Sequence, residues 1–96
     1  MPTYIVLLNY TQQGIQNIKG SPARLDAAKK MAKAAGAELK AYYLTMGRFD
    51  EMVVVEAPDD ETMAKLAVVT AALGNVRTET MRAFTEEEYR EIIAGL

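Results

Sequence analysis

The stretch from Thr45 to Val55 constrains the fold of this 96-residue chain more than any other. Gly47 supplies a position where the backbone can adopt a positive φ, and Asp50 offers a short acceptor for the amides of its own turn. Four apolar residues follow without interruption, Met52 to Val55, and such a run is typical of a strand covered on both faces. The stretch therefore predicts a β-hairpin whose second strand, Glu51 to Ala57, lies inside a sheet.

The other predicted strands differ in how polar they are. Apolar residues of both parities at Thr3 to Tyr10 indicate a second central strand, whereas the polar segment Val76 to Phe84 suits a sheet edge. The remaining strand, Ala37 to Met46, precedes the Gly47 turn. Strand alternation would place its residues Leu39, Ala41, Tyr43 and Thr45 on one face.

Three helices are predicted from their capping residues and from apolar spacing. Ser21 as N-cap, followed by Pro22, begins the first of them. The acidic run 59–61 begins the second because the helix dipole favours acids there, although the same run could form a carboxylate metal site. Thr85 opens a capping box before the third. These helices would span 22–35, 60–73 and 86–96, and a short helical turn capped by Thr11 is expected within the connection 11–20.

The order βαββαβ plus a terminal helix predicts one α+β domain over residues 1–96 with a ferredoxin-like arrangement. Right-handed crossovers then give an antiparallel sheet of strand order 4-1-3-2 with both main helices on one face. The opposite face carries apolar residues of the two central strands, and the terminal helix is too short to cover it. Because monomers rarely expose such a patch, we expect a homodimer, or a higher homo-oligomer, through this face.

Composition excludes several classes of function. Histidine and cysteine are absent, which removes disulfides, thiolate nucleophiles, serine–histidine triads and the usual zinc or haem ligands. We therefore predict neither a metal nor a cofactor. The net charge of −2 offers no electrostatic basis for binding nucleic acid or an anionic membrane. No apolar run approaches the roughly 20 residues needed to cross a bilayer, and the first residues lack a basic signal-peptide region, so a cytoplasmic location is expected.

The predicted topology brings three turns to one end of the sheet: the connection 11–20, the hairpin 47–50 and the turn 73–75. The start of the first long helix lies at the same rim and favours anions. We predict that this rim binds a small anionic or carbonyl-bearing ligand, with Arg77 holding a carboxylate in two hydrogen bonds and Asp50 orienting Arg77. The candidate ligand-binding residues are Gln13, Lys19, Arg48, Asp50, Asn75 and Arg77.

Simpler interpretations of these residues stay open. The glycines at 14, 47 and 74 could serve backbone conformation alone, and Asp50 could merely pair with Arg77 at the surface. The tyrosines at 4, 10, 42 and 43 could pack in the core with solvated hydroxyls. No catalytic residue can be assigned, because neither a pair of acids nor a nucleophile with a base is evident.

The segments Thr11–Lys19, Met46–Asp50, Glu56–Glu61 and Leu73–Thr78 resemble the GYD domain family, and the resemblance extends over nearly the whole chain. This chain has Phe49 where the motif that names the family has tyrosine. The resemblance implies the dimeric α+β barrel version of the ferredoxin-like fold but no established biochemical role. Gly47 to Phe84 is more weakly similar to the effector-sensing domain of leucine-responsive-type bacterial regulators, which bind small molecules such as amino acids between subunits.

Three functions are compatible with these features. The first is a non-catalytic module that binds or senses a small molecule, which the polar groups at the rim favour. The second is a cofactor-free dimeric-barrel enzyme, monooxygenase-like or isomerase-like, which would use tyrosine or arginine to polarise its substrate in a dry pocket. The third is an assembly or interaction protein whose interface is its function.

Overall fold

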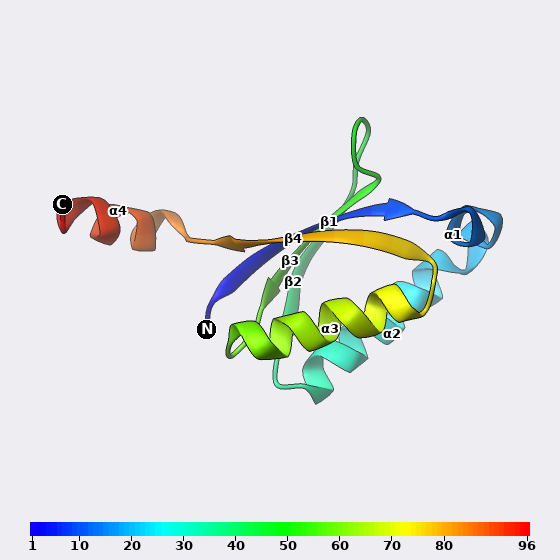
Figure 1. Cartoon of the computed structure of the whole chain (residues 1–96), viewed down its shortest axis with the longest axis horizontal. Helices are drawn as coiled ribbons and strands as arrows, with labels where there is room; N and C mark the ends of the chain where they lie inside the picture. The colour runs from blue at the N-terminus through cyan, green and yellow to red at the C-terminus, as the bar shows by residue number, and fades with distance from the viewer.

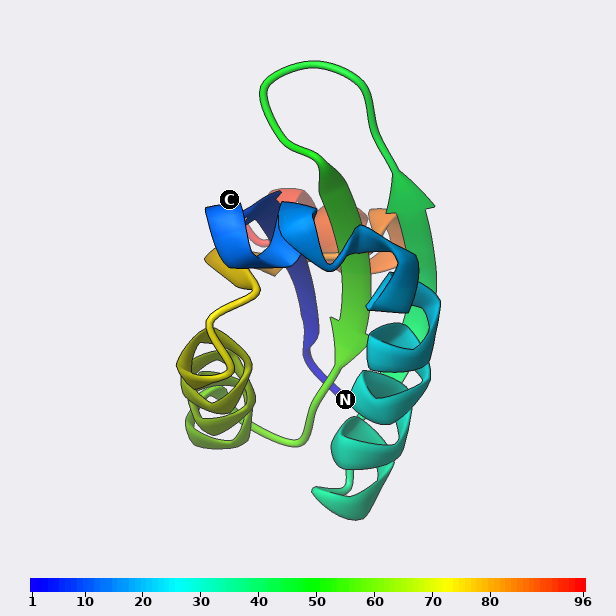
Figure 2. The same cartoon turned by 90° about the vertical axis from the view of Figure 1, so that its right-hand side faces the viewer.

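A computed structural model describes residues 1–96 and confirms the predicted α+β architecture. Its four-stranded antiparallel sheet has the order β2-β3-β1-β4, and helices α2 and α3 cover one face of it (Figures 1 and 2). The elements are β1 (Thr3–Tyr10), α1 (Gln12–Gln16), a 3₁₀ turn η1 (Ile18–Gly20), α2 (Ser21–Ala34), β2 (Glu38–Leu44), β3 (Glu51–Glu56), α3 (Asp60–Ala72), β4 (Val76–Ala83) and α4 (Glu86–Ala94). No helix combines the length and apolar character needed to span a bilayer.

The core lies between the two central strands and the two long helices. Alternate residues of β1 and β3, such as Val6 and Val53, are buried beneath the helices because side chains of a strand point to opposite faces in turn. On the helices, Ala32, Met63 and Leu66 are buried against them. The intervening residues of β1 and β3 point to the other face, which the helices leave open.

A β-bulge in β2 changes which of its side chains face the helices. The β2–β3 register shifts between Leu39 and Ala41, so that Lys40 is the extra residue. Leu39 and Tyr42 consequently lie opposite buried residues of β3, whereas Tyr43 lies on the open face. The simple alternation predicted for this strand was therefore wrong, because one inserted residue reverses the side-chain parity beyond it.

The helix starts confirm most of the predicted caps. Thr11 accepts a hydrogen bond from the amide of Gly14 at 3.1 Å, and Thr85 forms the predicted capping box with Glu88. Ser21 is not an N-cap, however, because α2 begins at this residue and the preceding Gly20 is already in helical conformation. The 3₁₀ turn η1 runs directly into α2 and leaves no extended residue between them.

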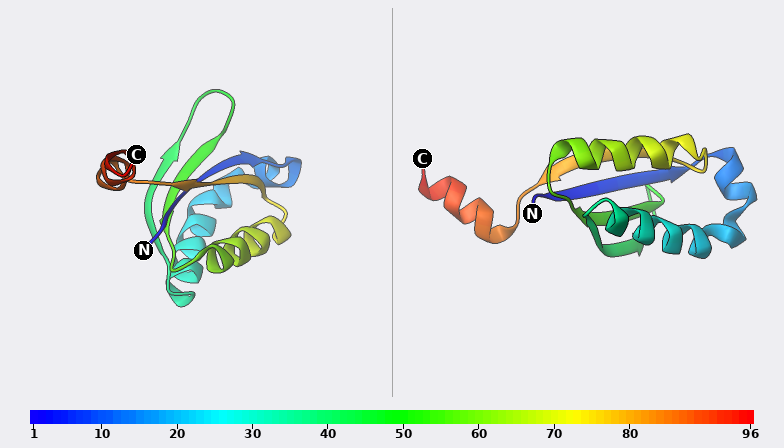
Figure 3. Two further views of the ribbon diagram at one scale, coloured as in Figure 1. Left: turned by 60° about the vertical axis from the view of Figure 1, so that its left-hand side comes forward. Right: turned by 90° about the horizontal axis from the view of Figure 1, so that it is seen from below.

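Helix α4 lies beyond the end of β4, clear of the sheet and of the two long helices (Figures 1 and 3). Its side chains Tyr89, Ile92 and Ile93 are each about half exposed, at 57%, 49% and 48%. The chain thus leaves two apolar surfaces uncovered, one on α4 and one on the open face of the sheet.

Gly47 adopts a φ of +124° at the tip of the hairpin, which confirms the positive φ predicted there. We expect Gly47→Val to lower the free energy of unfolding by about 1–3 kcal/mol because a β-branched residue is strained in this region. Denaturant unfolding would measure the loss. The control is Met46→Val, since Met46 is fully exposed and no residue other than glycine has a positive φ. Equal unfolding midpoints for the two variants would show that Gly47 is not conformationally required.

Candidate binding site

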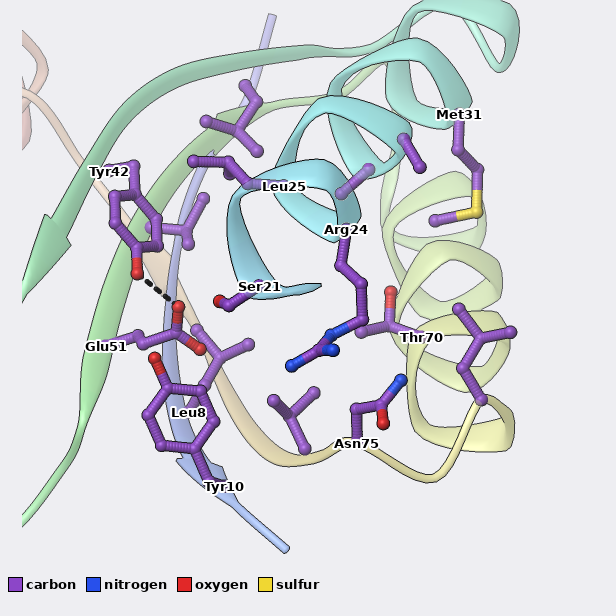
Figure 4. Close-up of a pocket in the computed structure, with 16 residues that line it drawn as sticks. Leu8, Tyr10, Ser21, Arg24, Leu25, Met31, Tyr42, Glu51, Thr70 and Asn75 are labelled. Carbon is purple, nitrogen blue, oxygen red and sulfur yellow. Dashed lines mark hydrogen bonds between the residues drawn. The ribbon is translucent and has the colours of Figure 1, made fainter. Parts of the chain in front are cut away.

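A cavity of about 190 Å³ lies between α2, the sheet and the end of α3 (Figure 4). This volume exceeds by more than tenfold the roughly 10–15 Å³ that one water needs. Most of the lining is apolar, and Figure 4 labels every polar residue of the lining. The polar lining residues are Tyr10, Ser21, Arg24, Tyr42, Glu51, Thr70 and Asn75.

Glu51 places a carboxylate inside this cavity. It is the first residue of β3 and shares the helix-facing parity of Val53, so that only 6% of the residue is exposed. The hydroxyl of Tyr42 donates a hydrogen bond to its Oε2. No protein group donates to the other oxygen, Oε1. Every fully enclosed side-chain oxygen of the structure has a hydrogen-bond partner, so Oε1 is not fully enclosed. It is open to the cavity into which the carboxylate points (Figure 4).

Tyr42 is held in its protonated form by this arrangement. Burial, the hydrogen bond to Glu51 and the charge of that carboxylate all raise the pKa of Tyr42 above its ordinary value of about 10. The phenol of Tyr10 points toward the same carboxylate (Figure 4). The end of the cavity at Glu51 therefore combines one carboxylate with two phenol groups.

Arg24 faces this carboxylate from α2, across the cavity (Figure 4). Its Nη1 donates to the carbonyl oxygen of Asn17 at 2.8 Å, and its Nη2 donates to that of Gly14 at 3.4 Å. The ion pairs of the structure are Lys40–Glu38 and Arg90–Glu86, and neither Arg24 nor Glu51 takes part in one. The cavity thus contains opposite charges that do not pair with each other.

Two of the three turns predicted to meet at the rim are joined by hydrogen bonds. The side-chain Nε2 of Gln13 donates to the carbonyl of Leu73 at 3.0 Å and to the side-chain oxygen of Asn75 at 3.1 Å. Thr11 adds a bond from its hydroxyl to the carbonyl of Gly74 at 2.6 Å. Among the six candidate ligand-binding residues, Asn75 lines the cavity, and Gln13 holds the turn that carries it.

Gly14 is needed for close packing at this junction, and it does not have a positive φ. A Cβ atom at this position would lie 2.0 Å from the carbonyl oxygen of Asn75. The amide of Thr11 already donates to that oxygen at 3.1 Å. The expectation that Gly14 serves backbone conformation alone was therefore wrong.

Asp50 binds the end of β1 instead of the amides of its own turn. Its carboxylate accepts a hydrogen bond from the amide of Tyr10 at 2.9 Å, and its own amide donates to the carbonyl of Leu8 at 2.9 Å. The base of the hairpin thus does lie at the predicted rim. Asp50 forms no ion pair with Arg77, which lies opposite Asn9 on the open face of the sheet.

The remaining predicted cations lie outside the cavity. Arg48 is exposed on the hairpin, which projects away from α1 (Figure 1), and Lys19 is exposed in η1. A role of Arg48, Lys19 or Arg77 in binding a ligand stays a prediction.

Sequence reasoning did not select Glu51, Arg24 or Tyr42 as site residues, although two of them carried a signal. Glu51 is an acid at a helix-facing position of a strand whose other residues of that parity are valines. Arg24 lies four residues before Ala28 and seven before Met31, which is the spacing of one helix face. Tyr42 could not be placed because the bulge in β2 has no recognisable sequence signal.

The raised pKa of Tyr42 predicts a pH dependence of stability. A raised folded-state pKa contributes stability that is fully present below the unfolded value of about 10 and is lost as the pH rises through the folded value. We expect the free energy of unfolding to fall above pH about 10, and to fall less steeply in Tyr42→Phe. Tyr43→Phe is the control, since that ring is 57% exposed. Denaturant unfolding between pH 8 and 11 would measure how the free energy of unfolding changes with pH. An equal change in Tyr42→Phe and Tyr43→Phe would contradict the predicted role of Tyr42.

Comparisons with known proteins agree with the fold and extend over most of the chain. In solved structures, the chain is similar to FFRP-DM1, with a TM-score of 0.63 and 19% identity over 88% of this chain and 100% of that one. It is also similar to TTHA0845 from Thermus thermophilus, with a TM-score of 0.57 and 25% identity over 88% of this chain and 95% of that one.

The sequence comparisons identify the family. A Thermus thermophilus protein named glutamine synthetase and cystathionine beta-lyase binding protein is 33% identical over 84 residues, which are 86% of this chain and 88% of that protein. The model of the GYD domain matches residues 4–93. This chain therefore belongs to the GYD domain family.

Proposed function

We propose that this protein is a small-molecule-binding module whose ligand occupies the cavity between α2 and the sheet. The observation that carries the proposal is the buried Glu51 carboxylate, whose Oε1 opens into the cavity without a protein donor. Burying an ionised carboxylate is costly unless it is hydrogen-bonded, and a bound molecule would supply the missing donor. Apolar walls with a few convergent polar groups are also the usual composition of a ligand site.

Thermal-shift screening of a metabolite collection tests this proposal. Ala28→Leu would narrow the cavity, whose wall includes Ala28, and should abolish the shift caused by a true ligand. Ala34→Leu is the matched control, because it makes the same change on the same helix outside the cavity. Ligands that stabilise both variants equally, or a collection without any ligand, would refute the proposal.

A cofactor-free enzyme is an alternative use of the same cavity. The hydroxyl of Tyr42 donates a hydrogen bond to Glu51. A carboxylate within reach of a bound molecule could act as a general base. Incubating any ligand found by the screen with the protein and following its conversion by mass spectrometry would separate the two functions. Turnover that is lost in Glu51→Gln would support the enzyme.

Binding to another protein is a second candidate function. It is favoured by the 33% identical relative, whose name describes it as a binding protein for glutamine synthetase and cystathionine beta-lyase. Biolayer interferometry of this protein against these two enzymes, purified from the organism that encodes this chain, would test it. Saturable binding that survives Ala28→Leu would support a surface role independent of the cavity, whereas no binding to either enzyme would exclude these two partners.

The open face of the sheet is expected to form a homodimer. Ile5, Leu7, Met52 and Val54 lie on this face, and each is only partly exposed in the single chain. A second copy would cover them in an isologous contact that buries at least about 800 Å² per partner. Light scattering at micromolar concentration should give twice the monomer mass. A monomer under these conditions would show that this face is not an interface between two copies.

A further inference from the structure

We infer that the cavity selects a small zwitterion, with a protonated amine against Glu51 and a carboxylate against Arg24. This inference rests on the proposed binding function and names its ligand class. It follows from the charges of the two opposing walls, which the protein itself leaves uncompensated (Figure 4).

The wall at Glu51 is suited to an ammonium group. Tyr42 donates to one carboxylate oxygen, and a neutral hydroxyl donor brings no positive charge to the carboxylate. The hydrogen bond from Tyr42 goes to Oε2 and leaves Oε1 without a protein donor, and neither of the two ion pairs of the structure involves Glu51. A protonated amine has three donors, two of which would serve this oxygen and the nearby phenol oxygen of Tyr10.

The wall at Arg24 is suited to a carboxylate. Two backbone carbonyls, of Asn17 and Gly14, accept from its two terminal nitrogens and hold the guanidinium in one orientation. A guanidinium has five N–H donors, so these bonds leave three of them unused and the positive charge uncompensated. Arginine binds carboxylates through paired hydrogen bonds. Asn75 and Ser21, which also line the cavity, add polar groups to this side.

The space between the two walls favours a molecule with an apolar body. Leu8, Leu25, Leu39 and Val53 line it, and its volume of about 190 Å³ limits the ligand to a small metabolite. An amine without a carboxylate would leave Arg24 uncompensated, and a carboxylate without an amine would leave Glu51 uncompensated. Only a molecule with both charges satisfies the two walls together.

Isothermal titration calorimetry with matched compounds tests this ligand class. One series is leucine, isopentylamine and 4-methylpentanoate, which share an isobutyl group. The first carries both charges, the second only the amine and the third only the acid. Phenylalanine, which has a larger body, begins a second series, and 5-aminopentanoate, which has a wider charge separation, begins a third. Each is compared with its own amine and its own acid. In at least one series the zwitterion should bind at least tenfold more tightly than either single-charge compound. Equal affinity of a single-charge compound, or no binding by any zwitterion, would overturn the inference.

Two variants test the assigned ends of the site. Glu51→Gln keeps an oxygen that accepts from Tyr42 but removes the charge, so it should weaken binding of the zwitterion and the amine at least tenfold and spare the acid. Arg24→Lys should weaken binding of the zwitterion and the acid and spare the amine. Circular dichroism would verify that both variants fold.

Arg77→Lys separates this site from the one predicted at the rim. Arg77 lies on the open face of the sheet, so this variant should retain full affinity. A tenfold loss in Arg77→Lys with none in Arg24→Lys would overturn the assignment of Arg24. If a neutral metabolite stabilises the parent but not Ala28→Leu, and no zwitterion binds, the ligand class is wrong and the binding function stands. Failure of every small molecule would refute both.

Discussion

Gly14→Ala is expected to lower the free energy of unfolding by about 3 kcal/mol, the upper part of the range for overpacking. The added Cβ would lie 2.0 Å from the carbonyl oxygen of Asn75, which is backbone and cannot rotate away. The amide of Thr11 donates to the same oxygen, so relieving the clash would also weaken the junction between α1 and β4. The melting temperature should fall by about 12–24 °C, since 1 kcal/mol corresponds to about 4–8 °C in a domain of this size.

The sign of the change in stability distinguishes packing from helix propensity. Overpacking makes Gly14→Ala destabilising, whereas helix propensity alone would make it stabilising. Gly14 is in helix α1, where alanine is intrinsically favoured over glycine by about 1 kcal/mol. Gly20→Ala is the matched control, because the nearest atom to its added Cβ is the flexible Arg24 Nη1 at 3.3 Å. Differential scanning calorimetry of both variants would decide. A Gly14→Ala variant as stable as Gly20→Ala would show that this junction adjusts without cost.

Val54→Lys is expected to convert the proposed dimer into a monomer. Val54 lies on the open face, opposite Ile5 of β1 and Ala41 of β2. In a two-fold interface each substitution occurs twice, and an unpaired buried ammonium costs several kcal/mol. The dissociation constant of the dimer should rise at least about a thousandfold, which corresponds to about 4 kcal/mol. Sedimentation equilibrium would measure it, and circular dichroism would verify the fold.

Val68→Lys is the control for this experiment. It makes the same chemical change at a residue of α3 that is 68% exposed, on the side of the sheet that carries the helices. We expect this variant to retain the association of the parent. If both lysine variants stay dimeric, the copies associate through another surface, such as the apolar side of α4.

The strand order and the caps could be predicted because they depend on local patterns and on chain handedness. Apolar residues of both parities marked β1 and β3 as the central strands, and the polar pattern of Val76 to Phe84 marked the edge. Right-handed crossovers then allowed a single arrangement. Thr11 and Thr85 were recognisable as caps by residue type, and each accepts a hydrogen bond from the amide three residues later.

The candidate site could be predicted only in part. The sequence placed the turns 11–20 and 73–75 together, and Asn75 and Gln13 do meet there. It also favoured Arg77, which is separated from the cavity because β4 pairs with β1 in a register that turns this residue to the open face. Glu51 and Arg24, the charged groups inside the cavity, each carried a signal in its own element, but neither signal shows that the two residues share a cavity.

The sequence by itself determined the fold class, the strand order and the family, because these depend on periodicity, capping and motif residues that are local in the chain. Only the tertiary structure decided which charges share a cavity. That outcome depends on the bulge at Lys40, which turns Tyr42 toward Glu51, and on the carbonyls of Gly14 and Asn17, which hold Arg24. The sequence carries no recognisable signal for this bulge or for the orientation of these carbonyls.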